Sequence, residues 1–316
     1  MASAQGVSLS GDARMGITHD SALATNKTAF TSRARVTFTL SGETDSGLAF
    51  GGSFGAHEAG DAAGGTAGSV FISGEFGRLT MGSASGGAQF INGHVAGVGL
   101  TGLGDKNEMT YLGNQAALRP TARYDYSIDG FSFAISYTNP GNASNVISVG
   151  AGYSFEGFTV GLGAERQNST AGVAAAAGSG TSAGGNLVLP VTAVDRIGTQ
   201  THLVASVGYS MDGIAVKATY GRLATGAVTA AANEGGGAIA KTTANQYGLS
   251  VSGSFDAISV TAFGKRDFNK DQHIGLGASY DLGGGASFVG GVTSTNFNAA
   301  GAKSRTHADL GLSFSF

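Results

Sequence analysis

The side chains with the clearest chemical potential are three arginines in the N-terminal part of the sequence. Arg33 and Arg35 are separated by one residue, and Arg14 lies upstream of them, close to Asp12. A guanidinium group stays charged at physiological pH and offers five hydrogen-bond donors, so three together would attract anions and create a local electric field. Whether they meet depends on secondary structure, because residues i and i+2 share a face in a β-strand.

A second set of charged side chains lies in a long segment, residues 84–120, that is rich in Gly, Ala and Ser. Its members able to carry charge near neutral pH are His94, Asp105, Lys106, Glu108 and Arg119. A connection this long far exceeds the usual ~4–6 residues, which indicates a function. Calcium prefers oxygen ligands, so Asp105 and Glu108 with loop carbonyls are candidate ligands, although two carboxylates are few. No other cofactor is required.

Other short motifs carry no prediction of catalysis, because chance matches are frequent in a chain with 55 glycines among 316 residues. The stretch GVGLTG at 97–102 fits a dinucleotide-binding pattern but has no strand–helix unit around it. The stretches GGSFG at 51–55 and GTSAG at 180–184 fit a nucleophile motif but lie in a strand and a loop, respectively. His57 and Glu58 lack the second histidine of a zinc-protease helix.

Composition excludes several classes of protein. Charged residues make up 12% and the net charge is -3, so there is no basic face for a nucleic acid. The absence of cysteine rules out disulfides, thiolate metal sites and a cysteine nucleophile. With 41% hydrophobic residues the chain is too apolar for a disordered coil. No apolar run is long enough for a membrane-spanning helix.

The elements that position these residues are β-strands, because apolar and polar residues alternate along most of the chain. Residues 32–40 read SRARVTFTL, with Val36 and Phe38 on one face and both arginines on the other. Alternation is typical of a strand with one apolar and one polar side. The same pattern recurs at 121–128, 131–137, 274–282 and 306–316. Arg14 and Asp12 share the polar face of the first segment, so the arginines can be neighbours across a strand pair.

Sixteen such segments follow one another, and their connections alternate between short and long. The segments begin near residues 6, 30, 46, 67, 77, 121, 130, 145, 156, 200, 212, 244, 256, 270, 284 and 303. An even strand number, with tight turns at one end and long loops at the other, is typical of an outer-membrane barrel. We therefore predict an all-β fold in a single domain, residues 1–316: a 16-stranded antiparallel transmembrane β-barrel with short periplasmic turns and long external loops. Such a barrel encloses a lumen wider than side chains can fill, and folding residues 84–120 inward would narrow it.

A soluble β-sandwich is the alternative, but it has fewer strands and a charged outer face. Here nearly all charges within strands fall on the polar face, so the apolar face contacts lipid. Aromatic residues cluster near the tight turns and near the long loops, which fits two interfacial girdles. Phe71 and Phe263 fall on the polar face, where either a bulge or a packed position on the inner wall would explain them.

Whole strands and turns of this sequence resemble the general diffusion porin of purple non-sulfur photosynthetic bacteria. The stretches that carry the resemblance are VSLSGDARMG at 7–16, SRARVTFTLSGETDSGLAFGGSF at 32–54, GLGASYDLGGGASFVGG at 275–291 and ADLGLSFSF at 308–316. The resemblance implies a homotrimer of barrels in the bacterial outer membrane that passes small hydrophilic solutes and ions passively. It also implies that the third long loop, 84–120, folds into the barrel, and that Phe316 belongs to an assembly signal. Outer-membrane lipid and lipopolysaccharide are the expected surroundings.

The resemblance assigns Arg14, Arg33 and Arg35 to a basic cluster that faces acids on the inward loop across the pore. The family's loop is strongly acidic, whereas this loop offers Asp105 and Glu108 against three arginines. We therefore expect a weak cation preference or a mild anion preference. A simpler possibility is that the arginines only neutralise lumen carboxylates such as Asp12. No secretory signal peptide precedes the first segment, so we expect the sequence to be the mature form with a start methionine.

Two rival functions follow from the same barrel. An outer-membrane enzyme, such as a protease or phospholipase, would need a histidine on the lumen wall, and His57, His202, His273 and His307 have the required parity. A substrate-specific channel for sugars would need aromatics along the lumen, where this sequence has mostly Gly, Ser, Thr and Ala. Unspecific diffusion is therefore the favoured interpretation.

Overall fold

The structure, a computed structural model, describes residues 6–59, 62–142, 144–168, 198–227 and 240–316. Most of two long loops, 169–197 and 228–239, therefore lies outside the described residues. The strands are β1 (Gly6–Asp20), β2 (Thr28–Glu43), β3 (Ala49–Ala59), β4 (Ala62–Gly74), β5 (Gly77–Gly82), β6 (Thr121–Ile128), β7 (Phe131–Tyr137), β8 (Val146–Phe155), β9 (Phe158–Gln167), β10 (Gln200–Met211), β11 (Ile214–Thr225), β12 (Thr242–Phe255), β13 (Ile258–Arg266), β14 (Gln272–Gly283), β15 (Ala286–Asn296) and β16 (Arg305–Ser315). Between β5 and β6 lie one short helix, α1 (Gly87–Asn92), and two 3₁₀ turns, η1 (Leu112–Asn114) and η2 (Ala116–Leu118).

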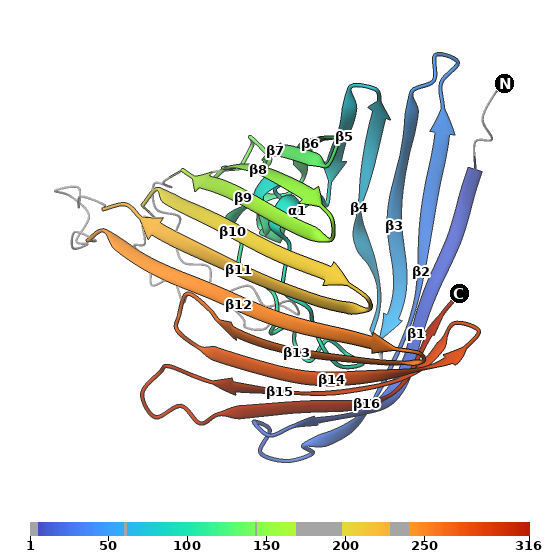
Figure 1. The fold of residues 1–316 in the computed structure, drawn as a ribbon, viewed down its shortest axis with the longest axis vertical. Helices are drawn as coiled ribbons and strands as arrows, with labels where there is room; N and C mark the ends of the chain where they lie inside the picture. Colours follow the sequence, from blue (N-terminus) through green and yellow to red (C-terminus); the bar gives the residue numbers. More distant parts are fainter. Residues whose placement is uncertain (1–5, 60–61, 143, 169–197, 228–239) are drawn as a thin grey trace.

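The sixteen strands form one closed antiparallel barrel, as the sequence predicts. Each strand pairs with its neighbours in the chain, and β1 closes the ring by pairing with β16 as well as with β2. Figure 1 shows the strands in sequence order around the ring, with α1 inside it. The largest difference from the predicted strand starts is at β4, which begins at Ala62 rather than near residue 67. Its pairing with β3 contains an irregularity between Ser53 and Gly55, which obscures the alternation there.

The tight turns form because acidic residue–glycine pairs accept left-handed backbone conformations. Asp129 and Gly130 have φ values of 49° and 83°, and Asp212 and Gly213 have 50° and 78°. Two successive positive φ values are typical of the type I′ turn, whose twist matches that of the flanking strands. These turns keep neighbouring strands in register and bring them all to one end of the barrel.

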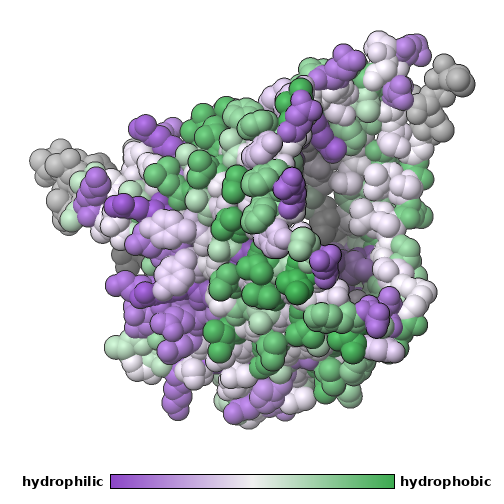
Figure 2. Space-filling model, viewed as in Figure 1, coloured by the Kyte–Doolittle hydropathy of each residue, from purple (hydrophilic) through white to green (hydrophobic). Residues whose placement is uncertain are grey.

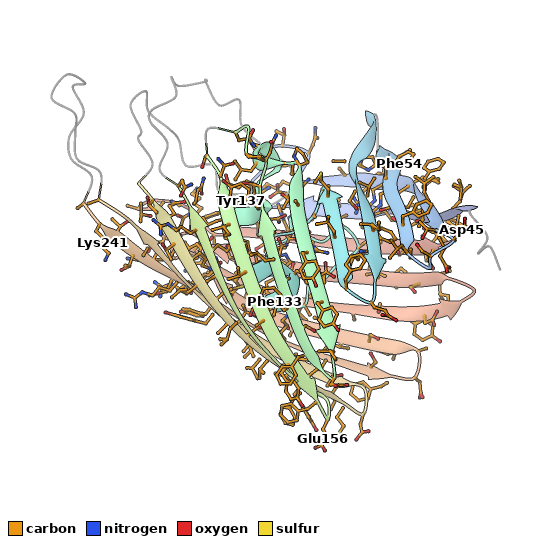
Figure 3. The ribbon with its side chains drawn as sticks, turned by 90° about the horizontal axis from the view of Figure 1, so that it is seen from above. Asp45, Phe54, Phe133, Tyr137, Glu156 and Lys241 are labelled. Atoms are coloured by element: carbon orange, nitrogen blue, oxygen red, sulfur yellow. The ribbon has the colours of Figure 1, made fainter. Side chains whose placement is uncertain are left out.

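The outward face of the barrel is apolar, and the inward face is polar. Val36, Phe133 and Leu310 are 41%, 43% and 44% exposed on the outside. At the turn end, ring contacts at centroid distances of 4.3 to 5.6 Å link the aromatic residues Phe131, Tyr153, Phe155, Phe158 and Tyr209 into one band. In Figure 3, Glu156 marks this turn end, Tyr137 lies toward the loop end, and Phe133 lies between them. An apolar band bounded by aromatics is the outer surface of a membrane barrel.

The packed core lies inside the barrel, where the segment between β5 and β6 contacts the inner wall. Three clusters of buried apolar side chains join the segment to strands β8, β10 and β13: Ala88, Met109, Tyr111 and Val204; Val95, Val98, Leu103 and Phe263; Leu112, Leu118 and Val146. In the described part of the chain, no helix is long and apolar enough to cross a membrane.

Candidate functional site

Near its start the segment 84–120 forms α1, which polar side chains of β7, β8 and β10 fix to the wall. The first backbone N–H groups of a helix have no partner within the helix. Here Gly87 N–H donates to Ser136 Oγ (3.0 Å) and Ala88 N–H donates to Ser148 Oγ (2.9 Å). At the other end of α1, Ser206 Oγ–H donates to Asn92 Oδ1 at 2.9 Å. Wall residues thus cap the helix from outside its own chain segment.

Past α1 the segment continues along the wall and ends at a tip held by Asp309 of β16. Ala96 N–H donates to Ser250 Oγ of β12 at 2.9 Å. The Asp309 carboxylate accepts hydrogen bonds from Leu100 N–H (2.9 Å), Thr101 N–H (2.6 Å) and Thr101 Oγ1–H (2.7 Å). Asp309 is only 6% exposed, so three charge-assisted hydrogen bonds satisfy a nearly buried carboxylate.

The returning half of the segment is held by a buried cluster of Glu165, His202 and Gln246. The Glu165 carboxylate accepts hydrogen bonds from Leu112 N–H at 2.8 Å and Gly113 N–H at 3.0 Å, and it lies 2.8 Å from His202 Nδ1. Gln246 contacts the backbone of Thr110 twice, as acceptor at 2.9 Å and donor at 2.8 Å. Glu165, His202 and Gln246 are at most 1% exposed, so they contact the loop and not the solvent in the lumen.

Lumen-facing glycines allow the segment to lie flat on the wall. A Cβ atom on Gly291 would lie 2.7 Å from the Cα of Gly99, and one on Gly150 would lie 2.5 Å from the backbone oxygen of Gly87. Both distances are too short for a side chain to fit without moving the loop. The high glycine content therefore has a structural reason where backbone packs on backbone.

The arginine cluster lies on β1 and β2, beside the loop tip. The strand register places Arg14 directly opposite Arg33, and Asp12 directly opposite Arg35. Arg35 Nε donates to both Asp12 oxygens, at 3.0 and 2.8 Å, and Arg33 Nη2 donates to Oδ1 at 3.2 Å. The one hydrogen bond of Arg14 in the described structure joins its Nη1 to Leu100 O at 3.5 Å. Asp12 therefore neutralises part of the cluster, and Arg14 meets the loop instead.

Asp105 and Glu108 form no ion pair with the three arginines among the described residues, and their facing the arginines across the pore stays a prediction. They border a cavity of about 340 Å³ together with Asn107 and residues of β13–β15 such as Ser259 and Thr261. Burial, and then the nearby Asp105, raises the pKa of Glu108. Lys106 lies beside them and forms no ion pair with any described acid.

The calcium prediction rests on the same two carboxylates. Calcium takes six to eight oxygen ligands, of which Asp105 and Glu108 supply the charged ones. Within the described ranges, no group of three or more His, Cys, Asp or Glu side chains is placed to hold a metal ion. The donor set is thus small for a dedicated calcium site, and no step of the function is assigned to a metal.

His94 is a structural residue of the loop and does not contribute charge to it. Its Nδ1 accepts a hydrogen bond from Met109 N–H at 2.9 Å, and its Nε2 faces the side-chain amide of Gln89 at 3.0 Å. Burial, reinforced by Lys217 and Lys265, lowers the pKa of His94 to about 4. It is therefore neutral at pH 7, contrary to its inclusion among the charged loop residues.

The two aromatic residues on the polar face have different explanations. Phe263 is 6% exposed and packs under the loop against Val95 and Val98, which makes it a covered position of the inner wall. Phe71 stays on the lumen side, and the guanidinium of Arg78 lies 3.7 Å above its ring. The anchors Glu165 and Asp309 were not predicted as site residues. Their polar parity placed them on the lumen wall, but nothing local indicated which loop atoms they hold.

Comparison with known proteins decides the family. The profile of the family described as Gram-negative porin matches residues 1–300. The chain is 36% identical over 328 residues to the porin of Rhodobacter capsulatus, covering 98% of this chain and 100% of that protein. The chain belongs to the Gram-negative porin family. A solved porin structure, refined at 1.8 Å resolution, superposes on this porin with a TM-score of 0.73 and 30% identity, covering 98% of this chain and 100% of the other. A triple mutant of the Rhodopseudomonas blastica porin has the same fold, with a TM-score of 0.65, 19% identity and the same coverage.

Family membership identifies this porin as a non-enzymatic channel of the Gram-negative outer membrane. Of the four lumen-parity histidines, His202 pairs with Glu165, His273 Nε2 lies 3.2 Å from Asp267, and His307 Nε2 lies 3.1 Å from Asp20. The resemblance read from the strand and turn sequences is confirmed, as are the barrel, the localisation and the absence of catalysis.

Proposed function

We propose that this porin passes small hydrophilic solutes and ions passively, and that residues 84–120 set the width of its pore opposite Arg14, Arg33 and Arg35. The observation that carries the proposal is the path of the segment across the interior. At one end of this path, the capped helix α1 contacts β7. At the other end, the segment contacts Asp309 of β16 and Arg14 of β1. A segment fixed at both ends of such a path occupies lumen volume and leaves the passage along the wall that carries the arginines.

The same geometry supports a mild anion preference. With Asp12 ionised, the cluster of Arg14, Arg33 and Arg35 carries a net positive charge, and neither loop acid is bonded to it. Charge at a constriction sets ion selectivity. A transverse field across the opening would also orient dipolar solutes and hinder apolar ones, which cannot replace ordered water.

The test is the reversal potential of the purified porin in a planar bilayer under a KCl gradient. We expect chloride to be preferred, and Arg14→Gln/Arg33→Gln to reduce that preference. Arg166→Gln/Arg222→Gln, which removes the same two charges from the outward face, is the matched control and should leave the preference unchanged. Clear cation selectivity of the unaltered porin would refute the charge argument.

The described lumen wall favours unspecific diffusion over a substrate-specific channel. Of the two aromatic residues on the polar face, Phe263 is covered by the loop and Phe71 by Arg78. Liposome swelling should therefore fall smoothly with solute size across sugars of similar polarity. A sharp preference for one sugar over its stereoisomers would contradict this.

The functional unit that we propose is a homotrimer. Phe30 is 93% exposed on the outward face and stands beside an apolar depression of about 730 Å³ bordered by Met15, Ile17 and Leu312 of β1 and β16. An exposed aromatic side chain next to an apolar depression on one surface suits packing against a second copy of the chain.

A further inference from the structure

We propose that Arg166, Arg222 and Arg266 form a binding site for the phosphate groups of an outer-leaflet glycolipid, on the outer surface of the barrel. The inference deepens the expected contact with lipopolysaccharide by naming its site. It rests on the outer-membrane placement and not on the pore.

The three arginines all face outward, which the strand pairing establishes. Arg166 of β9 pairs with Ile147, and Arg222 of β11 pairs with Leu203. Arg266 of β13 pairs with Tyr247. Residues paired across strands share a face, and Ile147, Leu203 and Tyr247 are 44%, 54% and 48% exposed on the outside. The arginines are the charged residues of these strands on a face that is otherwise uncharged and mostly apolar.

Their depth corresponds to the headgroup region of the bilayer. Arg222 lies two residues beyond Tyr220 toward the loop end, and Arg266 is level with Tyr247. Tyr220 and Tyr247 pair with each other across β11 and β12, and both are nearly half exposed. Tyrosines of a membrane barrel mark the interface, so the arginines lie at or just outside the polar boundary of the membrane.

The protein supplies these guanidinium groups with no anion. None of the three forms an ion pair or hydrogen bond with a described residue. Arg266 even has an enclosed Nε without a partner. Asp267 and Asp271, the acids of the loop that follows Arg266, accept hydrogen bonds from the backbone of the β13–β14 and β15–β16 loops. Partners for charges at this depth must therefore come from the membrane.

The spacing suits a headgroup with more than one phosphate. Successive arginines lie two strands apart and are offset by about two residues, which separates their Cα atoms by roughly 12 Å. The intervening outward positions are Thr201 of β10 and Asn245 of β12, which add polar groups without charge. Figure 2 shows hydrophilic side chains gathered at the left of the view, where Figure 1 places the loop ends of β11–β13. Arginine binds phosphate through two parallel hydrogen bonds, so the row could hold a single headgroup from several sides.

The opposite end of the barrel has the reverse charge. Each of the seven tight turns carries or adjoins an acid and holds no basic residue: Asp45, Glu75, Asp129, Glu156, Asp212, Asp256 and Asp281. In Figure 3, Glu156 lies at this end, and Lys241 lies at the loop end. In the described strands, outward-facing arginines occur at the loop end and not at the turn end, which suits a membrane whose lipid phosphates bind at its outer leaflet.

The experiment measures binding of lipid A to the purified porin in zwitterionic detergent, with phosphorylated lipid A, its dephosphorylated form and inorganic phosphate as separate probes. We expect the phosphorylated lipid to bind at least tenfold more tightly than the dephosphorylated lipid. Arg166→Gln/Arg222→Gln/Arg266→Gln should weaken its binding at least tenfold. Replacement of the three by lysine should have an intermediate effect, because lysine keeps the charge and loses the planar fork. Inorganic phosphate alone should not compete at millimolar concentration.

The matched control is Lys27→Gln/Lys270→Gln/Lys303→Gln, which removes three positive charges from the external loops. It should bind lipid A as the unaltered porin does, and a loss equal to that of the arginine variant would overturn the site. Equal affinity for both forms of lipid A, or saturation by inorganic phosphate, would also overturn it. KCl conductance of the arginine variant should be unchanged, which separates this test from that of the pore. The single variant Arg222→Gln gives the same comparison if the triple variant fails to fold.

Discussion

At the scale of single residues, the inner wall works through buried acids that hold the backbone of the loop. Asp309 and Glu165 each accept hydrogen bonds from two consecutive N–H groups, at Leu100–Thr101 and at Leu112–Gly113. These anchors lie near the tip and on the returning half of the loop. Most of these hydrogen bonds come from backbone N–H groups, so they fix the position of the loop largely independently of its side chains; the exception within the loop is the Thr101 hydroxyl.

We expect Asp309→Asn to loosen the tip of the loop. The amide keeps one acceptor oxygen but turns an NH₂ group toward N–H donors, which should cost about 2 kcal/mol. Hydrogen exchange of the Leu100 and Thr101 amides should then be about 30-fold faster. Asp256→Asn is the control, since it makes the same change in an exposed turn where the backbone has a φ of 49° and asparagine is tolerated. Unchanged exchange at the loop tip would contradict the assigned role of Asp309.

His94 should make stability depend on pH in one direction. Its folded pKa of about 4 lies below the unfolded value near 6.5, so the unfolded chain binds a proton in this window that the folded chain does not. Stability should therefore fall as pH decreases from about 6.5 to about 4, by up to ~1.4 kcal/mol per unit. His94→Asn can accept the Met109 hydrogen bond without titrating and should flatten this part of the curve. Identical curves of thermal midpoint against pH for both proteins would disprove this.

At the scale of elements, the glycines of the strands and the path of the loop depend on each other. The segment 84–120 lies on the wall of β7–β16 because positions such as Gly150 and Gly291 leave room for its backbone. A strand that alternates lipid-facing apolar residues with glycine therefore has two different faces. Its outer side chains contact the membrane, and its inner face is flat, so that the loop backbone can pack against it.

We expect Gly291→Val to push the loop tip away from the wall and narrow the pore. The new Cβ would lie 2.7 Å from Gly99 Cα, so the backbone of the loop must move into the lumen. Single-channel conductance should drop, and liposome swelling should fall most for the largest sugars that pass. Gly264→Val is the control, because a Cβ there meets nothing within 4 Å on the outward face. An equal effect of both variants would show that the strand and not the loop is disturbed.

At the scale of the whole molecule, the barrel separates its charges along the membrane normal and its polarity across the wall. Each tight turn carries or adjoins an acid, the arginines of the proposed lipid site lie outside at the loop end, and the lumen has its own basic cluster. The charge distribution along the membrane normal affects how the barrel contacts lipid. The difference in polarity between the outer and inner faces affects which solutes pass through the lumen. The two sets of arginines, on opposite faces of the wall, can therefore be altered independently.

The proposed trimer makes a prediction at this scale. Conductance in planar bilayers should appear in groups of three equal steps, since three pores insert together. Phe30→Ser should reduce the temperature at which the oligomer dissociates in mild detergent, because the ring would no longer fill the neighbouring depression. Phe133→Ser, on the outward face of β7, is the control. Conductance steps that occur singly, from porin that purifies as a monomer, would refute the trimer.

The strands, their number, their faces and the tight turns could all be predicted from the amino-acid sequence. Each of these is local, because side-chain direction in a strand alternates with a period of two and an acidic residue–glycine pair selects its turn wherever it occurs. The lumen placement of Arg14, Arg33 and Arg35 follows from that period together with the first strand pair. Only the tertiary structure decided the path of residues 84–120. Its hydrogen bonds reach partners 154 and 208 positions away, at Ser250 and Asp309, and no periodic pattern encodes such pairings. The turn of Asp105 and Glu108 toward β13–β15 and the neutral state of His94 depend on the same distant contacts, because both result from burial against the wall.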